Sequence, residues 1–273
     1  MKKEILRRKE IILRALPDIG KYLKFMQSKN DLEISRKKNL VDLVTEADKG
    51  SEEMIVKAVL NEFPDDHILG EEGGTRQGKS DFRWVIDPLD GTTNFTHKLP
   101  LYAVSIGLEY IPERKICAGF VLLPALDELY HAVQDEGSYK NDKRIYVSST
   151  EKMIEALFCT GFPYRREDNT DRILEYLKNM LVLTRGIRRT GAAALDLCWV
   201  AEGRFDGFWE ESLSPWDIAA GGFIIQQAGG KVSTFDGNSF SLDMPNILAT
   251  NAKIYEKALL EFKENLSKRM EHY

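Results

Sequence analysis

The feature that most constrains the fold of this 273-residue chain is a change in the spacing of its apolar residues near residue 146. Before that point, short apolar runs between residues 83 and 133 are separated by turn residues, which is typical of antiparallel strands. After it, strand-length runs alternate with amphipathic stretches of helical length, which is typical of α/β structure. The pattern predicts two subdomains that share one core, an α+β subdomain over residues 1–146 and an α/β subdomain over residues 147–273.

Helical periodicity predicts two helices ahead of the first strands. Residues 4–27 carry apolar side chains at helical spacing, and Pro17 is expected to kink or split this helix. A basic, polar stretch over residues 35–42 follows and is predicted to be a loop or a short strand. Residues 48–63 form the second predicted helix, and residues 67–70 form a short strand after it.

The charge balance argues against a general nucleic-acid binder or a protein of anionic membrane surfaces. The formal net charge is −5 and 43% of the residues are hydrophobic, although a local basic pocket is compatible with these values. No run approaches the ~18 apolar residues of a membrane span, and the charged N-terminus lacks the apolar core of a signal peptide. We therefore expect a cytoplasmic protein with no nucleic-acid and no membrane partner.

The cysteines argue against a disulfide framework or a thiolate zinc site. Cys117, Cys159 and Cys198 are odd in number and far apart, and no two of them form a CxxC pair. Each lies among apolar neighbours, where free cysteines are usually buried. We expect three buried structural thiols in a reducing compartment.

Acidic residues stand out at strand ends and at one helix start. Glu71 and Glu72 follow the strand at residues 67–70 and open a predicted loop. Asp87 and Asp90 follow the apolar run WVI, in a stretch that is predicted to be a sharp turn. Asp217 lies in the first turn of an apolar helix, where it could also simply complement the helix dipole. Open α/β architectures bind ligands at such strand ends and helix starts.

The segment WVIDPLDGTTNF, residues 84–95, indicates a cation beside a phosphate. Carboxylates without basic partners repel one another unless a hard cation such as Mg²⁺ neutralises them. Gly91, Thr92 and Thr93 could begin a helix whose N–H groups point at an anion. The spacing does not fit an EF-hand loop. Pro88 stands where haloacid-dehalogenase phosphatases have their nucleophilic aspartate, which argues against a covalent aspartyl-phosphate route.

Four ordered motifs resemble the inositol monophosphatase family. They are WVIDPLDGTTNF at residues 84–95, PWDIAAGGFIIQQAGG at residues 215–230, DLVTEAD ending at Asp48, and GEE at residues 70–72. The resemblance runs from about residue 37 to residue 230. It implies a layered α-β-α-β-α sandwich, in the α/β (α+β) class. It also implies a phosphomonoesterase that depends on two to three Mg²⁺ ions per site, is inhibited by lithium and is usually a homodimer.

The resemblance assigns metal ligands residue by residue. Glu71, Asp87 and the carbonyl of Leu89 match the ligands of the first metal. Asp87, Asp90 and Asp217 match the ligands of the second, and Glu71 also matches a contact of a weaker third metal. Most of these ligands therefore fall in residues 1–146, and Asp217 comes from the second subdomain.

The resemblance also assigns catalytic and substrate-binding roles. Asp48 and Thr92 match the pair that orients the attacking water, and Glu71 is counted with them as catalytic. The backbone of Gly91 and Thr92 would hold the phosphate. The expected substrate contacts of the second subdomain are Gly191, Ala192, Ala193, Glu210 and Asp217. None of the four histidines falls on a matched catalytic position.

The leading prediction is hydrolysis of inositol monophosphate or a similar small sugar phosphate by a metal-activated water. A fructose-1,6-bisphosphatase, with or without dual activity, is one alternative. A 3′-phosphoadenosine bisphosphate phosphatase is another, but such relatives commonly read DGTKEF where this chain has DGTTNF. A catalytically silent regulatory binding module is the alternative from a different class. Arg188 and Arg189 could contact a second phosphate or be solvated strand residues.

Overall fold

The computed structural model describes residues 1–29, 34–36, 43–163 and 170–270. Within these ranges the chain forms seven α-helices, two large sheets and one two-stranded sheet. The two-stranded sheet pairs β1 (Ile34–Arg36) with β2 (Leu43–Thr45). The stretch over residues 35–42, predicted to be a loop or a short strand, lies mostly outside the described residues.

The larger sheet is built from the eight strands that follow the first two helices. Its strands are β3 (His67–Gly70), β4 (Gly74–Arg76), β5 (Phe82–Asp90), β6 (Ala103–Tyr110), β7 (Lys115–Leu123), β8 (Glu128–Val133), β9 (Gly137–Lys140) and β10 (Lys143–Ile145). They lie in the order β10-β9-β8-β7-β6-β5-β3-β4, and only β3 and β5 pair in parallel. The predicted antiparallel character of this part of the chain is confirmed. β4 was not expected, because its three residues are all exposed and carry no apolar pattern.

The smaller sheet comes from the second half of the chain. Its strands are β11 (Leu157–Thr160), β12 (Gly186–Arg188), β13 (Gly207–Glu211), β14 (Gly230–Ser233) and β15 (Asn246–Asn251). They lie in the order β12-β11-β13-β15-β14. β11 pairs in parallel with both of its neighbours, whereas β15 pairs antiparallel with both of its own. Helices alternate with these strands along the chain, as predicted.

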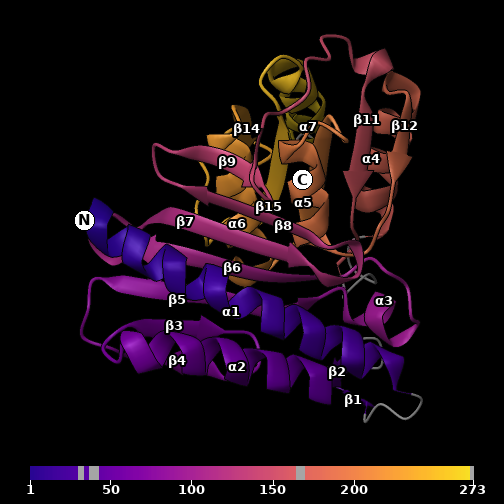
Figure 1. Ribbon diagram of the computed structural model, residues 1–273. Coiled ribbons are helices and arrows are strands. Elements are labelled where there is room, and N and C mark those ends of the chain that lie inside the picture. Colours follow the sequence, from indigo (N-terminus) through magenta and orange to yellow (C-terminus); the bar gives the residue numbers. More distant parts are fainter. Residues whose placement is uncertain (30–33, 37–42, 164–169, 271–273) are drawn as a thin grey trace.

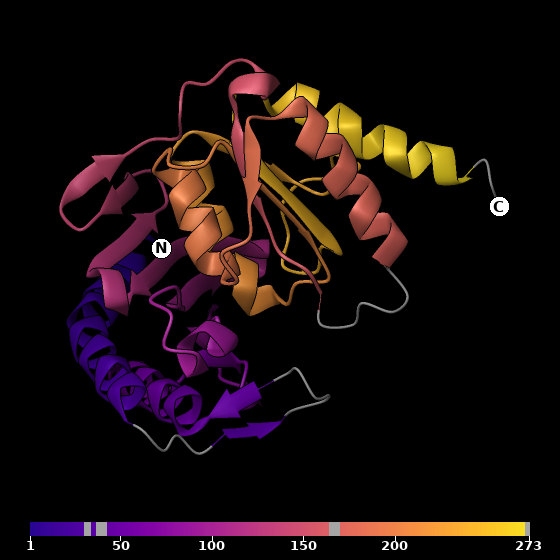
Figure 2. The same cartoon turned by 90° about the vertical axis from the view of Figure 1, so that its right-hand side faces the viewer.

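Six of the seven helices form three layers, one between the two large sheets and one on the outer face of each sheet (Figures 1 and 2). Layer by layer they are α1 (Lys2–Ser28) and α2 (Glu46–Glu62), then α5 (Ala193–Ala201) and α6 (Pro215–Gln227), then α4 (Thr170–Leu183) and α7 (Tyr255–Met270). The order of layers is therefore α-β-α-β-α. The predicted layered sandwich is confirmed.

Of the two expected effects of Pro17, a split is wrong, because helix α1 runs without interruption, and a kink stays a prediction. A proline inside a helix removes one N–H donor and costs about 3 kcal/mol. Pro17 lies on the exposed side, whereas the opposite side packs on α2 and the larger sheet. That buried side consists of Ile5, Ile12, Leu16, Ile19, Leu23 and Met26. Burial contributes ~1.5–3 kcal/mol for each such side chain, so the six together exceed the cost of the proline.

Helix α6 lies unusually close to the larger sheet. A Cβ atom added at Gly119 of β7 would lie 2.8 Å from the carbonyl oxygen of Ala220, and one at Gly107 of β6 would lie 2.7 Å from the Cβ of Ala219. Both distances are too short for real atoms, so only glycine fits at these two positions. The small residues after Asp217 thus allow the close packing that fixes the start of α6 against the sheet.

The apolar core between the sheets draws on both halves of the chain. Val121 and Ala132 of the larger sheet belong to the same buried cluster as Leu197, Phe208 and Ile224. A shared core of this kind is what the spacing of apolar residues predicts. The boundary between residues 146 and 147 stays a prediction.

The three cysteines are buried and free, as predicted. Burial raises the pKa of the Cys117 thiol to about 12, and burial also raises the pKa values of Cys159 and Cys198. The thiols are therefore protonated at neutral pH and act as small apolar side chains. Among the described residues, no helix is both long enough and apolar enough to cross a membrane.

Candidate active site

The end of β5 carries the two aspartates of the segment at residues 84–95. The strand keeps its pairing with β6 as far as Asp90, with a register shift between Asp87 and Asp90. The shift contains Pro88, which has no N–H group to donate to a neighbouring strand. Such irregularities re-aim side chains at the rim of a sheet. The predicted turn at Asp87 is therefore wrong, because strand pairing extends the element to Asp90 and the chain turns at Gly91.

Gly91 brings the end of β5 against the second half of the chain. Its φ angle is +87°, in the left-handed region that favours glycine, and the five-residue helix α3 (Thr92–Thr96) starts directly after it. A Cβ atom at Gly91 would lie 3.0 Å from the carbonyl oxygen of Leu101 and 3.1 Å from the Cβ of Ala192. The expected phosphate-holding residue thus lies next to an expected substrate contact.

Asp48 and Thr92 are in hydrogen-bond contact although they are 44 residues apart in sequence. Asp48 is buried in the first turn of α2, where its Oδ2 accepts hydrogen bonds from the N–H (2.8 Å) and Oγ1 (2.6 Å) of Thr45. The Thr92 Oγ1 lies 3.1 Å from Asp48 Oδ1 and 3.1 Å from the carbonyl oxygen of Leu89. The hydroxyl therefore donates toward one of two acceptors, and its own lone pairs stay available to accept.

Four carboxylates converge beside this pair. Asp87 is 2% exposed, and burial is the main cause that raises its pKa. The negative charges of Glu71, Asp90 and Asp217 raise the pKa of Asp87 further, as does a side-chain hydrogen bond to Glu71. The structure thus brings together all four acidic residues that the resemblance assigns to metal binding.

Backbone N–H groups orient three of these carboxylates. Asp87 Oδ1 accepts a hydrogen bond of 3.0 Å from the N–H of Leu89. Asp90 Oδ2 accepts a hydrogen bond of 2.7 Å from the N–H of Ala194, at the start of α5. Asp217 Oδ2 accepts one of 2.7 Å from the N–H of Ser214, at the start of α6. Burial raises the pKa of Asp90 to about 7, although its backbone hydrogen bonds act to lower it. Burial is also the main cause that raises the pKa of Asp217, and the negative charge of Asp90 raises it further.

The donor set suits a hard divalent cation in its chemistry. Carboxylate and carbonyl oxygens are the ligands that Mg²⁺ prefers, and a cation would relieve the repulsion among the four carboxylates. Among the described residues, no three acidic, histidine or cysteine side chains are already spaced as a closed metal site.

A cavity of about 70 Å³ adjoins the carboxylates. Of the expected site residues, it is lined by Asp90, Gly191, Ala192, Ala193, Glu210 and Asp217. The small residues 191–193 leave the cavity open at the start of α5. The structure therefore places the expected substrate contacts next to the expected metal ligands.

Glu210 reaches the cavity from β13 and is 8% exposed. A Cβ atom at Gly161 would lie 2.0 Å from Glu210 Oε2, so the glycine leaves the room that this carboxylate fills. Burial raises the pKa of Glu210, and the charge of Asp217 raises it further. A substrate hydroxyl could donate a hydrogen bond to this buried carboxylate.

The two arginines before the substrate segment differ in their surroundings. Arg188 is exposed, does not line the cavity and donates a hydrogen bond to the carbonyl oxygen of Ile187. Arg189 lines the cavity, and its guanidinium carbon lies 5.7 Å from the centre of the Phe162 ring. Its charge opposes the rise that burial causes in the pKa of Glu210. Both arginines are exposed, but only Arg189 lines the cavity, where it could contact a second phosphate.

Sequence reasoning missed several residues of this site. Gly161, Phe162, Asp196 and Leu213 also line the cavity. Gly161 and Phe162 directly follow β11, a position where ligand contacts are common, and this was the available signal. Glu52 lies one helical turn after Asp48, and its side chain accepts hydrogen bonds from the backbone of the loop that carries Glu71. The spacing of four residues from Asp48 was the available signal.

Comparison with known proteins identifies the family. The pattern of the Inositol monophosphatase family matches residues 5–267. A Nus factor SuhB from Pseudomonas aeruginosa is 42% identical over 255 residues, which cover 92% of this chain and 93% of that protein. An inositol-1-monophosphatase from Mesorhizobium japonicum is 42% identical over 84% of this chain and 85% of its own length. The crystal structure of extragenic suppressor protein suhB from Bartonella henselae has a TM-score of 0.89 and 36% identity, and the match covers 94% of this chain and 98% of that one. The chain therefore belongs to the inositol monophosphatase family, and this membership supports a phosphatase.

Proposed function

We propose that this protein is a Mg²⁺-dependent phosphomonoesterase that hydrolyses inositol monophosphate or a similar small sugar phosphate. The observation that carries the proposal is the convergence of Glu71, Asp87, Asp90 and Asp217 beside the pair of Asp48 and Thr92. The relative from Mesorhizobium japonicum, an inositol-1-monophosphatase by name, supports the same reaction class.

The four carboxylates and the Leu89 carbonyl would hold the two to three magnesium ions. When bound, the ions supply positive charge that polarises the phosphate and lowers the pKa of a bound water. Glu71 directly follows β3, Asp87 lies on the adjacent strand β5, and Asp217 comes from α6. The two halves of the chain therefore both contribute ligands.

Thr92 and Asp48 would orient the attacking water. With its hydroxyl hydrogen donated to Asp48, the Thr92 oxygen would accept a hydrogen bond from the water. The Asp48 carboxylate can then take up the proton that the water loses. The N–H groups of Gly91 and Thr92 would hold the phosphate oxygens, where charge grows during the displacement.

The cavity side of the site would bind the rest of the substrate. Glu210 would accept a hydrogen bond from a hydroxyl, and residues 191–193 would leave room for a sugar or cyclitol ring. Arg189 is a specific observation in favour of the second candidate, a fructose-1,6-bisphosphatase activity, because its guanidinium could bind a second phosphate.

A binding role is the alternative from a different class. The relative from Pseudomonas aeruginosa is named a Nus factor, so this chain could also serve as a regulatory partner, with or without catalysis. The presence of the complete acidic set and of the Asp48–Thr92 pair favours catalysis. The cytoplasmic location, the homodimer and the absence of a nucleic-acid partner stay predictions.

Phosphate release from a panel of substrates tests the proposal. We expect turnover of inositol-1-phosphate, or of a similar sugar phosphate, that disappears in excess EDTA, returns with Mg²⁺ and falls with Li⁺. Comparison of kcat/KM with fructose-1,6-bisphosphate and 3′-phosphoadenosine-5′-phosphate would rank the alternatives. Full activity in EDTA would contradict the metal mechanism, and no turnover of any substrate with Mg²⁺ would favour the binding role.

A further inference from the structure

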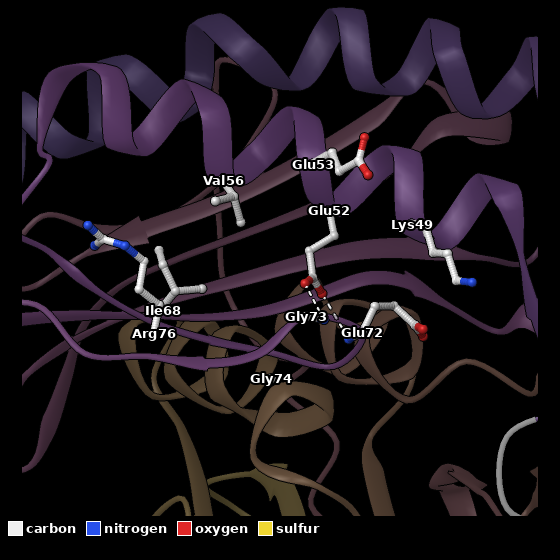
Figure 3. A pocket seen from close by; sticks show the side chains of 9 residues that line it. All are labelled: Lys49, Glu52, Glu53, Val56, Ile68, Glu72, Gly73, Gly74 and Arg76. Carbon is white, nitrogen blue, oxygen red and sulfur yellow. Dashed lines mark hydrogen bonds between the residues drawn. The ribbon is translucent and has the colours of Figure 1, made fainter.

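The loop after β3 carries Glu71 and is held by a buried carboxylate from α2. Glu52 is 6% exposed, and its two oxygens accept hydrogen bonds from two successive backbone N–H groups. Oε2 lies 3.0 Å from the nitrogen of Glu72, and Oε1 lies 2.6 Å from the nitrogen of Gly73. Figure 3 shows the side chain pointing from the helix into this loop. No assigned ligand or catalytic residue takes part in this clamp through its side chain.

The backbone of Glu71 is fixed from the other side. Its N–H group donates a hydrogen bond of 3.1 Å to the carbonyl oxygen of Ile86, the residue before Asp87. Three successive N–H groups of the loop are therefore held, one by β5 and two by Glu52. Together they set where the Glu71 side chain starts relative to that of Asp87.

Glycines on both sides of Glu71 and Glu72 make room for the clamp. A Cβ atom at Gly70 would lie 2.7 Å from Glu52 Oε1, and one at Gly73 would lie 2.5 Å from the same oxygen. Glu52 also lies four residues after Asp48, so the same face of α2 carries both side chains. Helix α2 therefore contributes two residues to the site, Asp48 beside Thr92 and Glu52 under the loop of Glu71.

A buried carboxylate is a costly way to secure a loop. Burial raises the pKa of Glu52, as do the charges of Glu72 and Glu71, and the two backbone hydrogen bonds oppose this rise. Apolar packing of similar volume usually stabilises a fold at least as well as a buried charge does. Glu52 is therefore better explained by the geometry that it imposes on the loop than by stability alone.

The loop has space to move if the clamp is removed. A cavity of about 340 Å³ lies between α2 and the β3–β4 hairpin, and Gly73 and Gly74 form part of its wall. Lys49 and Val56 line it from α2, and Arg76 lines it from β4 (Figure 3). Packing does not fill this volume, and the two hydrogen bonds from Glu52 restrain the loop from the α2 side.

We propose that Glu52 is a positioning residue that holds the loop of Glu71 in place before a cation binds and thereby sets the affinity of the site for Mg²⁺. The inference rests on the proposed function, because it takes Glu71 as a metal ligand. Residues that orient metal ligands typically change metal affinity by about 10- to 100-fold when they are replaced.

The test compares Glu52→Gln with Glu53→Gln. The first change keeps the size of the side chain but replaces one acceptor oxygen with an NH₂ group that faces a backbone N–H. The second changes an exposed neighbour that lines the same cavity. We expect Glu52→Gln to weaken Mg²⁺ binding to the metal-free protein about tenfold or more in calorimetric titration. Its kcat should recover at saturating Mg²⁺, and Glu53→Gln should match the wild type in both measurements.

Amide hydrogen exchange of the metal-free protein gives a second readout that needs no catalysis. The N–H groups of Glu72 and Gly73 should exchange about tenfold faster in Glu52→Gln than in the wild type, and those of β6 should be unchanged. Where Glu52→Gln does not fold, Glu52→Asp replaces it, since the shorter side chain keeps the charge but cannot reach both N–H groups.

Each contrary outcome has a distinct meaning. Unchanged Mg²⁺ affinity in a folded Glu52 variant would overturn the inference and leave the proposed function intact, and so would a loss of melting temperature without a change in affinity. A wild-type protein that neither binds Mg²⁺ nor releases phosphate would overturn both.

Discussion

Backbone hydrogen bonds aim the carboxylates of this site. Asp90 accepts from the N–H of Ala194 and Asp217 from the N–H of Ser214, each at the start of a helix. An asparagine in either place keeps the size of the side chain and one acceptor oxygen. At this scale, the charge of a residue can therefore be tested separately from its shape.

Asp217→Asn should remove catalysis without harming the metal-free fold. Under the proposed function, kcat should fall by orders of magnitude and the rise in melting temperature with Mg²⁺ should shrink, because a charged ligand is lost. Without metal, the melting temperature should stay equal or rise slightly, since repulsion among carboxylates is relieved. Asp171→Asn, in the first turn of α4, is the control for a purely dipolar role. A near-normal kcat with an undiminished Mg²⁺ effect would refute the shared site.

Arg189→Ala should affect substrates with a second anionic group most. A hydrogen bond to a charged group is worth ~1.5–3 kcal/mol, so the KM for a bisphosphate should rise about tenfold or more. The KM for a simple aryl phosphate should change little. Arg188→Ala is the matched control, because that side chain does not line the cavity. An equal effect of both variants on all substrates would show that neither arginine selects the substrate.

At the scale of elements, a buried ion pair fastens α1 to the sheet. Arg8 donates from Nε and Nη2 to the two oxygens of Asp66, over 2.8 and 2.7 Å. Trp84 of β5 donates to the same carboxylate, and Arg8 lies between the rings of Phe63 and Phe82. This cluster links the outer helix layer to the strand that carries Asp87 and Asp90.

Arg8→Ala should destabilise the protein strongly and leave its chemistry intact. Removal of one partner leaves the other charge buried without compensation, which costs about 3–5 kcal/mol. Arg7→Ala, which changes an exposed neighbour, should cost ~0.5 kcal/mol or less. Urea unfolding measures both values. A loss below ~1 kcal/mol for Arg8→Ala would mean that the apolar face of α1 alone fastens the helix.

Periodicity predicted most elements, and its failures have physical causes. The helix that became α1 was expected to be kinked or split at Pro17, and it is not split, because local rules do not include the burial of its far side. β4 and the last residues of β5 are strands only through pairing with neighbours, which a local pattern does not show. Motif resemblance predicted the site residues but not their positions in space, which only the structure gives. Glu52 and Phe162 were missed, since only tertiary packing determines that they reach the site.

At the scale of the whole molecule, the crowded carboxylates couple stability to pH. Burial raises the pKa of Asp90 from 3.8 to about 7, and burial raises those of Asp87 and Asp217 too. The folded state therefore holds protons that the unfolded state has released, so this contribution to stability is fully present below about pH 4 and is lost as the pH rises to about 7. Bound Mg²⁺ would replace these protons.

The stability of the metal-free protein should thus fall as the pH rises, and Mg²⁺ should offset this fall. In EDTA, Asp90→Asn should become more stable relative to the wild type between pH 5 and pH 8, because the variant lacks this titration. With Mg²⁺, the wild type should gain more melting temperature at pH 8 than at pH 5. Thermal unfolding of both proteins at the two pH values provides the measurement. A constant difference between them would mean that Asp90 is ionised throughout.

The hydrogen bond from the N–H of Ala194 to Asp90 has a consequence for the order of events during refolding. It joins the end of a strand in the larger sheet to a helix that packs against the smaller one. Under the proposed function, a chain with only one sheet formed lacks part of its ligand set. After dilution from denaturant, recovery of phosphate release should therefore lag behind or coincide with the slowest docking step. The recovery of enzymatic turnover would then report when the two sheets have docked. Far-ultraviolet circular dichroism would not report this step, because it follows only the formation of helices and strands.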